Sequence, residues 1–191
     1  MAEFTPTRSL AIALADERRT IREGYAFLDE KCLLLAGEML REVRRYRALV
    51  EELVPLRARA DQALAAALLR HGLHGLQVYP PPPGTQPLRV DRRALLGVAM
   101  IDARLAGEPG EAPPAVNASP EAAACGAAFT ALAVKLVEMA GVSGNLARLH
   151  AEYRKTVRRV RALQDVLLPE IEQTLHEVET SLEELEQDEA G

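Results

Sequence analysis

The 191-residue chain contains no tryptophan, only two cysteines and few aromatic side chains, which make up 4% of its residues. So few aromatic residues argue against a thick globular core or a β-sandwich. The abundance of alanine, leucine, glutamate and arginine instead favours long helices. The length suits one domain of ordinary size. We therefore expect an all-α fold.

The sequence also lacks long hydrophobic runs and cysteine pairs. No run approaches the roughly eighteen apolar residues of a membrane-spanning helix, and the first ten residues have no apolar signal core. Cys32 falls within an apolar helical stripe and Cys125 is distant in sequence, so we expect Cys32 to be a small buried hydrophobic residue. We expect a cytoplasmic protein that reaches a membrane only through partners, with no direct membrane insertion.

No motif for catalysis or ligand binding is present. Lys155-Thr156 lacks the glycines that a phosphate loop needs, and the serines have no nucleophile motif around them. His71 and His74 have no third ligand nearby in sequence, so we expect them to be surface histidines rather than a metal site. We predict no catalytic, cofactor-binding or metal-binding residues, and no enzyme activity.

The N-terminal part of the chain predicts one long helix. Thr5 or Thr7 can cap its start, with Pro6 in the first turn. His71-Gly72 offers a stop after Arg70. Apolar residues alternate at spacings of four and three, which is a heptad seam, and two successive steps of four that meet at Met39 make a stutter. This seam comprises Ile21, Tyr25, Leu28, Cys32, Leu35, Met39, Val43, Tyr46, Val50 and Leu53.

The C-terminal part predicts a second long helix that begins at Ser119-Pro120-Glu121. Pro169 lies inside it, but the apolar pattern continues on both sides, so we expect the helix to bend there and not end. The expected seam comprises Phe129, Leu132, Leu136, Leu146, Leu149, Tyr153, Val157, Val160, Leu167, Ile171, Leu175, Val178, Leu182 and Leu185.

The middle of the chain, 72–119, has a different chemistry. A β-like run at 76–79 precedes a proline tract at 80–83, which should be extended. A second apolar run, 94–101, contains Gly97. We expect a small irregular region that can hold a short β-hairpin, although the prolines leave its register open.

The two helices should pair, because a long helix with one apolar seam is not stable alone. A chain that leaves, turns and returns pairs antiparallel. End-to-end alignment sets Pro55 near Gly141 and Gly144, so helix breakers lie opposite each other. We therefore expect a long antiparallel two-helix coiled coil, with residues 1–54 and 145–191 as a shaft. Residues 55–144 would form an upper helical bundle and the proline-rich middle.

Two basic clusters, within 41–47 and 154–161, fall at a similar height in this antiparallel register. They can be a solvated helix face, or a collar for an external acidic partner, since like charges on paired helices repel mildly. We expect Arg44, Arg45, Arg158 and Arg159 to face outward and bind a partner. Nucleic acid is a poor match, because the net charge is −5 and no stacking aromatics interleave with the arginines.

Several segments of the sequence resemble a known protein family. Its C-terminal helix is similar to the signature of the D subunits of V-type and archaeal-type rotary ATPases, and the opening "TPTRSL", Gly24, Leu28, Lys31 and the central "LLGVAM" also fit. The signature is met by Lys155, Thr156, Arg158, Arg159, Val160, Ala162, Leu163, Leu168, Pro169, Thr174, Leu175, Leu182, Glu183 and Glu184.

The resemblance implies a central rotor shaft that transmits torque between ATP turnover in a head and proton or sodium translocation in a membrane rotor. The implied partners are head subunits A and B, the F subunit of the stalk and a funnel-like subunit that links to the membrane rotor ring. The shaft would then be cytoplasmic and peripheral to the membrane, within a membrane-bound complex. The alternative is a free-standing antiparallel coiled-coil adaptor or scaffold. In a rotor, the bend at Pro169 would fix the curvature of the shaft.

Overall fold

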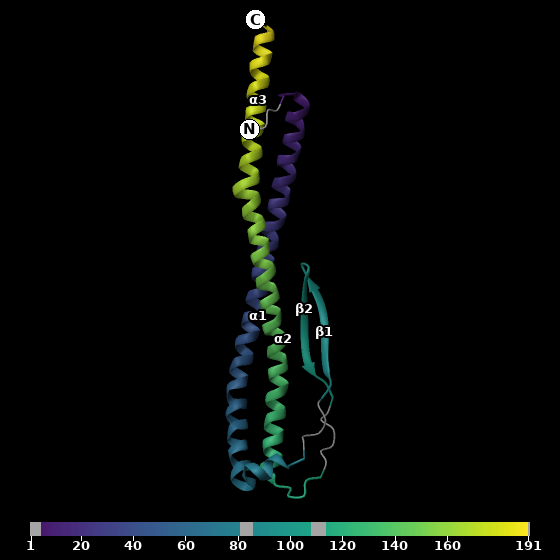
Figure 1. The fold of residues 1–191 in the computed structure, drawn as a ribbon, viewed down its shortest axis with the longest axis vertical. Coiled ribbons are helices and arrows are strands. Elements are labelled where there is room, and N and C mark those ends of the chain that lie inside the picture. The colour runs from purple at the N-terminus through teal and green to yellow at the C-terminus, as the bar shows by residue number, and fades with distance from the viewer. Residues whose placement is uncertain (1–4, 81–85, 108–113, 191) are drawn as a thin grey trace. The chain divides into compact units, whose positions relative to one another are not determined.

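The computed structural model describes residues 5–80, 86–107 and 114–190. Figure 1 shows its elements, and the predicted all-α coiled-coil fold with a small hairpin in the middle is confirmed. Residues 81–83 of the expected proline tract lie outside the described residues. The elements in chain order are α1 (Arg8–Gln77), β1 (Leu88–Leu95), β2 (Val98–Leu105), α2 (Pro120–Ala162), a π-helix η1 (Leu163–Leu167) and α3 (Leu168–Ala190).

The chain divides into two compact units. Unit 1 comprises Met1–Gly37 and Ala151–Gly191, and unit 2 comprises Glu38–His150. Both α1 and α2 therefore contribute residues to each unit. The sequence-based division into a shaft (1–54 with 145–191) and an upper bundle (55–144) remains a prediction.

The long helices begin where their capping residues predict. The Thr7 hydroxyl oxygen accepts a hydrogen bond from the Leu10 amide at 3.2 Å, so Pro6 precedes the cap and does not occupy the first turn. The Ser119 hydroxyl oxygen accepts one from the Ala122 amide at 3.1 Å, and Pro120 is the first residue of α2, as predicted. Such caps satisfy backbone amides that the helix itself leaves without partners.

The end of α1 differs from the prediction. Gly72 has a φ of 67°, a left-handed conformation that suits glycine and interrupts the helix near the predicted stop. After this single residue the chain turns helical again and continues to Gln77. The β-like run expected at 76–79 is therefore wrong, because its first two residues belong to this last helical turn.

In unit 1, the start of α1 pairs antiparallel with α3 and the end of α2. Arg8 binds Glu186 at 2.5 Å, Arg22 binds Glu172 at 2.6 Å, and Lys31 binds Glu152 at 2.6 Å. Partners thus descend in number on one helix as they rise on the other, as predicted. The core of this unit includes Cys32, Leu35, Val160, Ile171, Leu175 and Val178.

Cys32 is buried, as predicted. Burial raises the pKa of its thiol, and the nearby Asp29 carboxylate adds to this increase. The thiol therefore stays protonated at neutral pH and behaves as a small apolar group.

The helix continues through Pro169 as predicted, but it changes form just before the proline. Residues 163–167 form the π-helix η1, in which the Leu168 amide donates to the Leu163 carbonyl. Proline lacks an N–H and its ring crowds the carbonyl four residues earlier, and a wider turn relieves that crowding. The extra residue shifts the seam, so Leu167 is exposed and Leu168 is half-buried, contrary to the predicted seam.

In unit 2, the second part of α1 pairs antiparallel with the first part of α2 (Figure 1). Lys135 binds Glu52 at 2.9 Å and Glu138 at 3.3 Å, and these hydrogen bonds raise the pKa of Lys135. At the far end of α1, the His71 ring nitrogen lies 2.7 Å from the Ser119 hydroxyl. His71 is therefore half-buried and joins two helix ends, which corrects its prediction as a surface histidine.

The buried seam of unit 2 contains smaller side chains than the sequence predicts. Alanines at 60 and 67 are fully buried, whereas Phe129 and Leu136, which were expected in the seam, are 40% and 48% exposed. Alanines fill less volume between the paired helices than large apolar residues would. The large apolar residues therefore lie at the margin of this contact. The predicted seam residue Leu185, in unit 1, is likewise exposed.

The hairpin in the middle has a two-residue turn, Leu96-Gly97, with φ values of 51° and 84°. Positive φ at both positions is what a type I′ turn requires, and this turn matches the twist of antiparallel strands. It pairs Leu95 with Val98 and, at the other end, Leu88 with Leu105. The register that the sequence left open is thus set by the turn.

One helix among the described residues is long and apolar enough to cross a membrane, judged by length and composition alone. It is the continuous helical stretch Pro120–Asp188, and 11% of its apolar window is buried. A single helix of this kind is weak evidence for membrane insertion. Most residues of this window are half-buried or exposed within the described chain.

The ion pair of Lys31 and Glu152 predicts how stability depends on pH. The hydrogen bond from the Lys31 ammonium lowers the pKa of Glu152, although burial acts in the opposite direction. Because the folded-state pKa is depressed, this stabilisation is present above the unfolded-state pKa of about 4.3 and is lost as the pH falls through the folded-state pKa. Glu152→Gln should therefore lose less unfolding free energy than the parent between neutral pH and about pH 3.

Urea unfolding of the whole chain at several pH values measures this difference. Glu179→Gln, which removes an exposed carboxylate of the same unit, is the matched control and should follow the parent. Identical pH dependence in the parent and Glu152→Gln would contradict the role of the pair.

Candidate functional site

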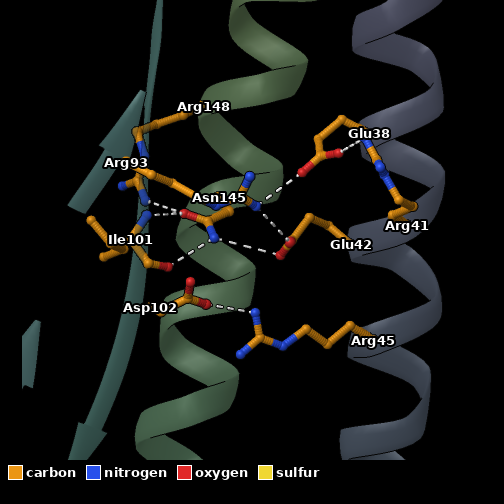
Figure 2. Close-up of polar contacts among 9 residues, drawn as sticks. All are labelled: Glu38, Arg41, Glu42, Arg45, Arg93, Ile101, Asp102, Asn145 and Arg148. Atoms are coloured by element: carbon orange, nitrogen blue, oxygen red, sulfur yellow. Dashed lines mark hydrogen bonds and ion pairs between the residues drawn. The ribbon is translucent and has the colours of Figure 1, made fainter. Parts of the chain in front are cut away.

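The most interconnected polar contacts in the described chain gather where β2 lies against α1 and α2 within unit 2. Figure 2 shows these residues, which we call the hairpin clasp. Side chains from β1, β2 and both helices converge there. The hairpin clasp comprises Glu38, Arg41, Glu42, Arg45, Arg93, Ile101, Asp102, Asn145 and Arg148.

Asn145 is the centre of the hairpin clasp and is 1% exposed. Its side-chain oxygen accepts from the Ile101 amide at 2.9 Å, and its side-chain nitrogen donates to the Ile101 carbonyl at 2.9 Å. The amide group thus pairs with the backbone of β2 as a neighbouring strand would. Arg148 also donates to the Asn145 oxygen at 2.7 Å, which orients the amide.

Two carboxylates, Glu38 and Glu42, are buried on α1 beside this pair. Arg93 of β1 reaches Glu38 at 3.0 Å and Glu42 at 3.8 Å, and Arg41 also forms an ion pair with Glu38. Buried charges are costly without partners, so these carboxylates require the hairpin to remain docked. The hairpin is therefore held by charge compensation as well as by the amide pair.

A second ion pair joins β2 to α1 nearer the surface. Arg45 donates to Asp102 at 2.7 Å, and this hydrogen bond raises the pKa of Arg45. Both side chains are partly exposed, so the pair contributes little to stability and mainly fixes orientation. Arg45, which was expected to face a partner, is thus already bound to the hairpin.

Two glycines of α2 make room for the hairpin clasp. A Cβ at Gly141 would lie 3.3 Å from both Cβ and N of Ala103, closer than most such contacts, so glycine lets β2 approach the helix. A Cβ at Gly144 would lie 3.3 Å from the Arg148 guanidinium. The sequence suggested a joint at these glycines. That joint remains a prediction, whereas in the structure Gly141 lies against β2 and Gly144 against Arg148.

The remaining predicted site residues lie on the surface. Arg44 belongs to unit 2, and Arg158 and Arg159 belong to unit 1, where all three are exposed. Pro169 is also exposed, two residues after η1. Partner binding by the arginines, and a bend at the proline, remain predictions.

The hairpin clasp can position the hairpin and compensate buried charges. Among the residues that the structure describes, no group of three or more His, Cys, Asp or Glu side chains is placed to hold a metal ion. Apart from Arg41–Glu38 within α1 and Arg148–Asn145 within α2, the interactions of the clasp described above join one secondary-structure element to another. Its arrangement therefore fixes the orientation of the hairpin relative to the two helices of unit 2.

Sequence reasoning missed the principal members of the hairpin clasp: Glu38, Glu42, Arg93 and Asn145. A signal was present, since Glu38 and Glu42 continue the heptad spacing of Leu35 and Leu49. If only apolar residues are counted, charged residues that occupy heptad positions of the seam are overlooked. Such residues predict that another element supplies compensating charge.

Comparison with known proteins gives one consistent family. A model of the family of ATP synthase D subunits matches residues 11–190. The V-type ATP synthase D subunit of Thermotoga neapolitana is 26% identical over 96% of this chain and 92% of its own length. The A-type ATP synthase D subunit of Methanopyrus kandleri is 26% identical over 98% and 83% of the two chains. The second V-type ATP synthase D subunit of Treponema pallidum is 30% identical over 95% and 88%.

The geometry of the hairpin clasp predicts the effect of removing its central amide. Asn145→Leu should lower the unfolding free energy by about 2 kcal/mol, because it leaves the half-buried amide and carbonyl of Ile101 without partners. Hydrogen exchange at the Ile101 amide should also become faster. Ser143→Ala, at an exposed position of α2, is the control and should change neither quantity. Unchanged exchange at Ile101 in Asn145→Leu would refute the central role of this amide.

Proposed function

This chain belongs to the family of ATP synthase D subunits, and we propose that it is the rotor shaft in the central stalk of a V-type ATP synthase or ATPase. In that role it transmits torque between ATP turnover in the head and proton or sodium translocation in the membrane rotor. The family match over residues 11–190, which includes both units, carries this conclusion. A free-standing coiled-coil adaptor would have no reason to share that match.

The shaft is non-catalytic in this proposal. In unit 1, the described ion pairs between Lys31 and Glu152 and between Arg22 and Glu172 hold two helices together. In unit 2, the hairpin clasp holds a hairpin to two helices. Such a distribution of polar groups supports a mechanical role for this chain, with the catalysis supplied by other subunits.

Exposed apolar residues support burial against partner subunits. In unit 1, the exposed fractions of Phe27, Leu33 and Leu34 on α1 are 67%, 70% and 52%. Apolar surface of this extent on one helix is typical of a protein interface. We assign this face to the complex around the shaft, with head subunits A and B and the F subunit of the stalk as the proposed partners.

The apolar surface of unit 2 is proposed to meet the funnel-like subunit that links to the membrane rotor ring. Between 120 and 144, α2 has only three charged residues, and Phe129 and Leu136 are exposed there. Near the end of α1, Leu69 and Leu73 are 91% and 62% exposed. Cover by a protein partner would account for this apolar surface without direct membrane insertion. The chain would then be cytoplasmic and peripheral to the membrane.

We also propose a functional division at the sequence-based boundaries. Residues 1–54 with 145–191 would be the shaft that turns within the head. Residues 55–144 would be the bundle and middle region that meet the membrane-side partner. The exposed apolar residues of unit 2 support a separate interface for this second part.

Co-expression tests the proposed function. The chain is produced with head subunits A and B and with the stalk's F subunit, all of the same organism, and the mixture is separated by size exclusion. Co-elution in one complex, whose ATP hydrolysis depends on this chain, is the expected result. A chain that elutes alone from every combination would refute the rotor assignment.

The exposed arginines should contribute to assembly more than to stability. Replacing Arg44, Arg45, Arg158 and Arg159 with glutamine should weaken complex formation in a salt-dependent way, because exposed charges steer association. The melting temperature of the isolated chain should change little. Arg45→Gln alone identifies the part of any change that comes from the Asp102 pair. A large fall in melting temperature in the fourfold variant would instead make the arginines structural.

Pro169 should affect how well the assembled motor couples ATP turnover to ion translocation. Pro169→Ala restores a backbone donor and removes a ring whose cost inside a helix reaches about 3 kcal/mol, part of which η1 already relieves. The isolated chain should therefore become more resistant to urea. The assembled motor should couple less well, since we propose that the proline sets the curvature of the shaft. Parental coupling in the variant motor would show that the proline is only tolerated.

A further inference from the structure

We propose that the outer edge of β1 is a docking site at which an extended, acidic segment of a partner protein adds to the hairpin as a third strand. The proposal rests on the geometry of the hairpin and its charges. It does not depend on the rotor function.

The hydrogen bonds of Ile101 establish which backbone groups of β1 point outward. Both its amide and its carbonyl bind Asn145, on the side of β2 away from β1. In an antiparallel ladder, residues alternate between pairs that exchange hydrogen bonds and pairs whose backbone groups point away. Ile101 is paired with Arg92, so the backbone groups of Arg92 must point to the outer edge of β1.

The same alternation extends along the strand. Leu88, Val90 and Ala94 lie at even spacing from Arg92, so their amides and carbonyls also point outward. In the described part of the chain, no hydrogen bond reaches these outward groups. The two edges of the hairpin therefore differ, because Asn145 occupies the edge of β2 while the edge of β1 remains available to another strand.

The side chains of β1 leave room for a partner strand. Seven of the eight residues of β1 are exposed, with Leu88 at 58% and Val90 at 39%. These two share one face of the strand with Arg92 and Ala94. A strand added here would cover aliphatic side chains while its backbone binds the outward groups, as in β-strand addition.

The charges on the hairpin indicate an acidic partner. Asp91 binds Arg104 at 2.9 Å, and Arg93 binds Glu38. Arg89 and Arg92 have no ion pair among the described residues, so β1 presents two uncompensated positive charges. A second copy of this chain is a poor occupant, because edge-to-edge pairing would bring arginines of the same sign together.

A defined probe tests the proposal with the whole chain. The probe is a fluorescent, capped octapeptide that alternates valine and glutamate, and its binding is followed by fluorescence anisotropy. Amide exchange measured by NMR locates it. We expect slower exchange at Val90, Arg92 and Ala94, whose amides point outward, and little change at Asp91 and Arg93, whose amides already point to β2.

Two matched pairs separate strand addition from charge attraction. Val90→Pro removes one outward amide and spares the ladder, so it should weaken binding about tenfold, whereas Val90→Ala should bind nearly as the parent does. A peptide with glutamine in place of glutamate should bind more weakly and lose the salt dependence. The NMR measurement uses the unaltered chain, so it stands even if Val90→Pro perturbs the hairpin.

Several results would overturn the proposal. These are no binding at millimolar peptide, equal binding by Val90→Pro and Val90→Ala, and protection of amides outside β1. Concentration-dependent dimers that protect β1 without peptide would assign the edge to a second copy. Absence of binding would leave the arginines as charges that keep an exposed strand edge from pairing.

Discussion

The pairing of the Asn145 amide with the backbone of Ile101 determines much of unit 2. One buried side chain takes the place of a strand, so β2 is held in a single register against α2. That register carries Arg93 to Glu38 and Glu42 and brings Asp102 to Arg45. Gly141 suits this arrangement, because a Cβ there would lie only 3.3 Å from Ala103 of β2. The same contact also reveals which backbone groups of β1 point outward.

Some of the residues that carry the family resemblance lie at the helix contacts of unit 1, including Thr156, Val160 and Leu175, which are buried. Thr156 is 2% exposed and donates to the Glu152 carbonyl, one turn earlier, while the carboxylate of Glu152 binds Lys31. A Cβ at Gly24 would lie 3.9 Å from the Leu163 side chain, so these two positions face each other. This part of the resemblance therefore reflects how two helices pack.

Heptad spacing predicted the paired helices and the buried positions at Cys32, Leu35, Ile171 and Leu175, and capping residues predicted where the helices start, because those features depend on local pattern. The hairpin clasp could not be predicted in this way, since it joins residues far apart in sequence. The π-helix before Pro169 was missed for another reason. Apolar residues at 167 and 168 both fit a seam, and only the relief of crowding around the proline decides between them.

The exposed apolar surface distinguishes one part of a complex from a self-sufficient protein. On α1, Leu35 is fully buried while its neighbours Leu33 and Leu34 are 70% and 52% exposed, so apolar residues occupy the outer face of the helix as well as the seam. An amphipathic helix that works alone places polar residues on its outer face. Apolar residues on both faces cost solubility unless a second surface covers the outer one. The sequence of α1 is therefore adapted to two contacts: the first is made within the chain, and the second requires other subunits.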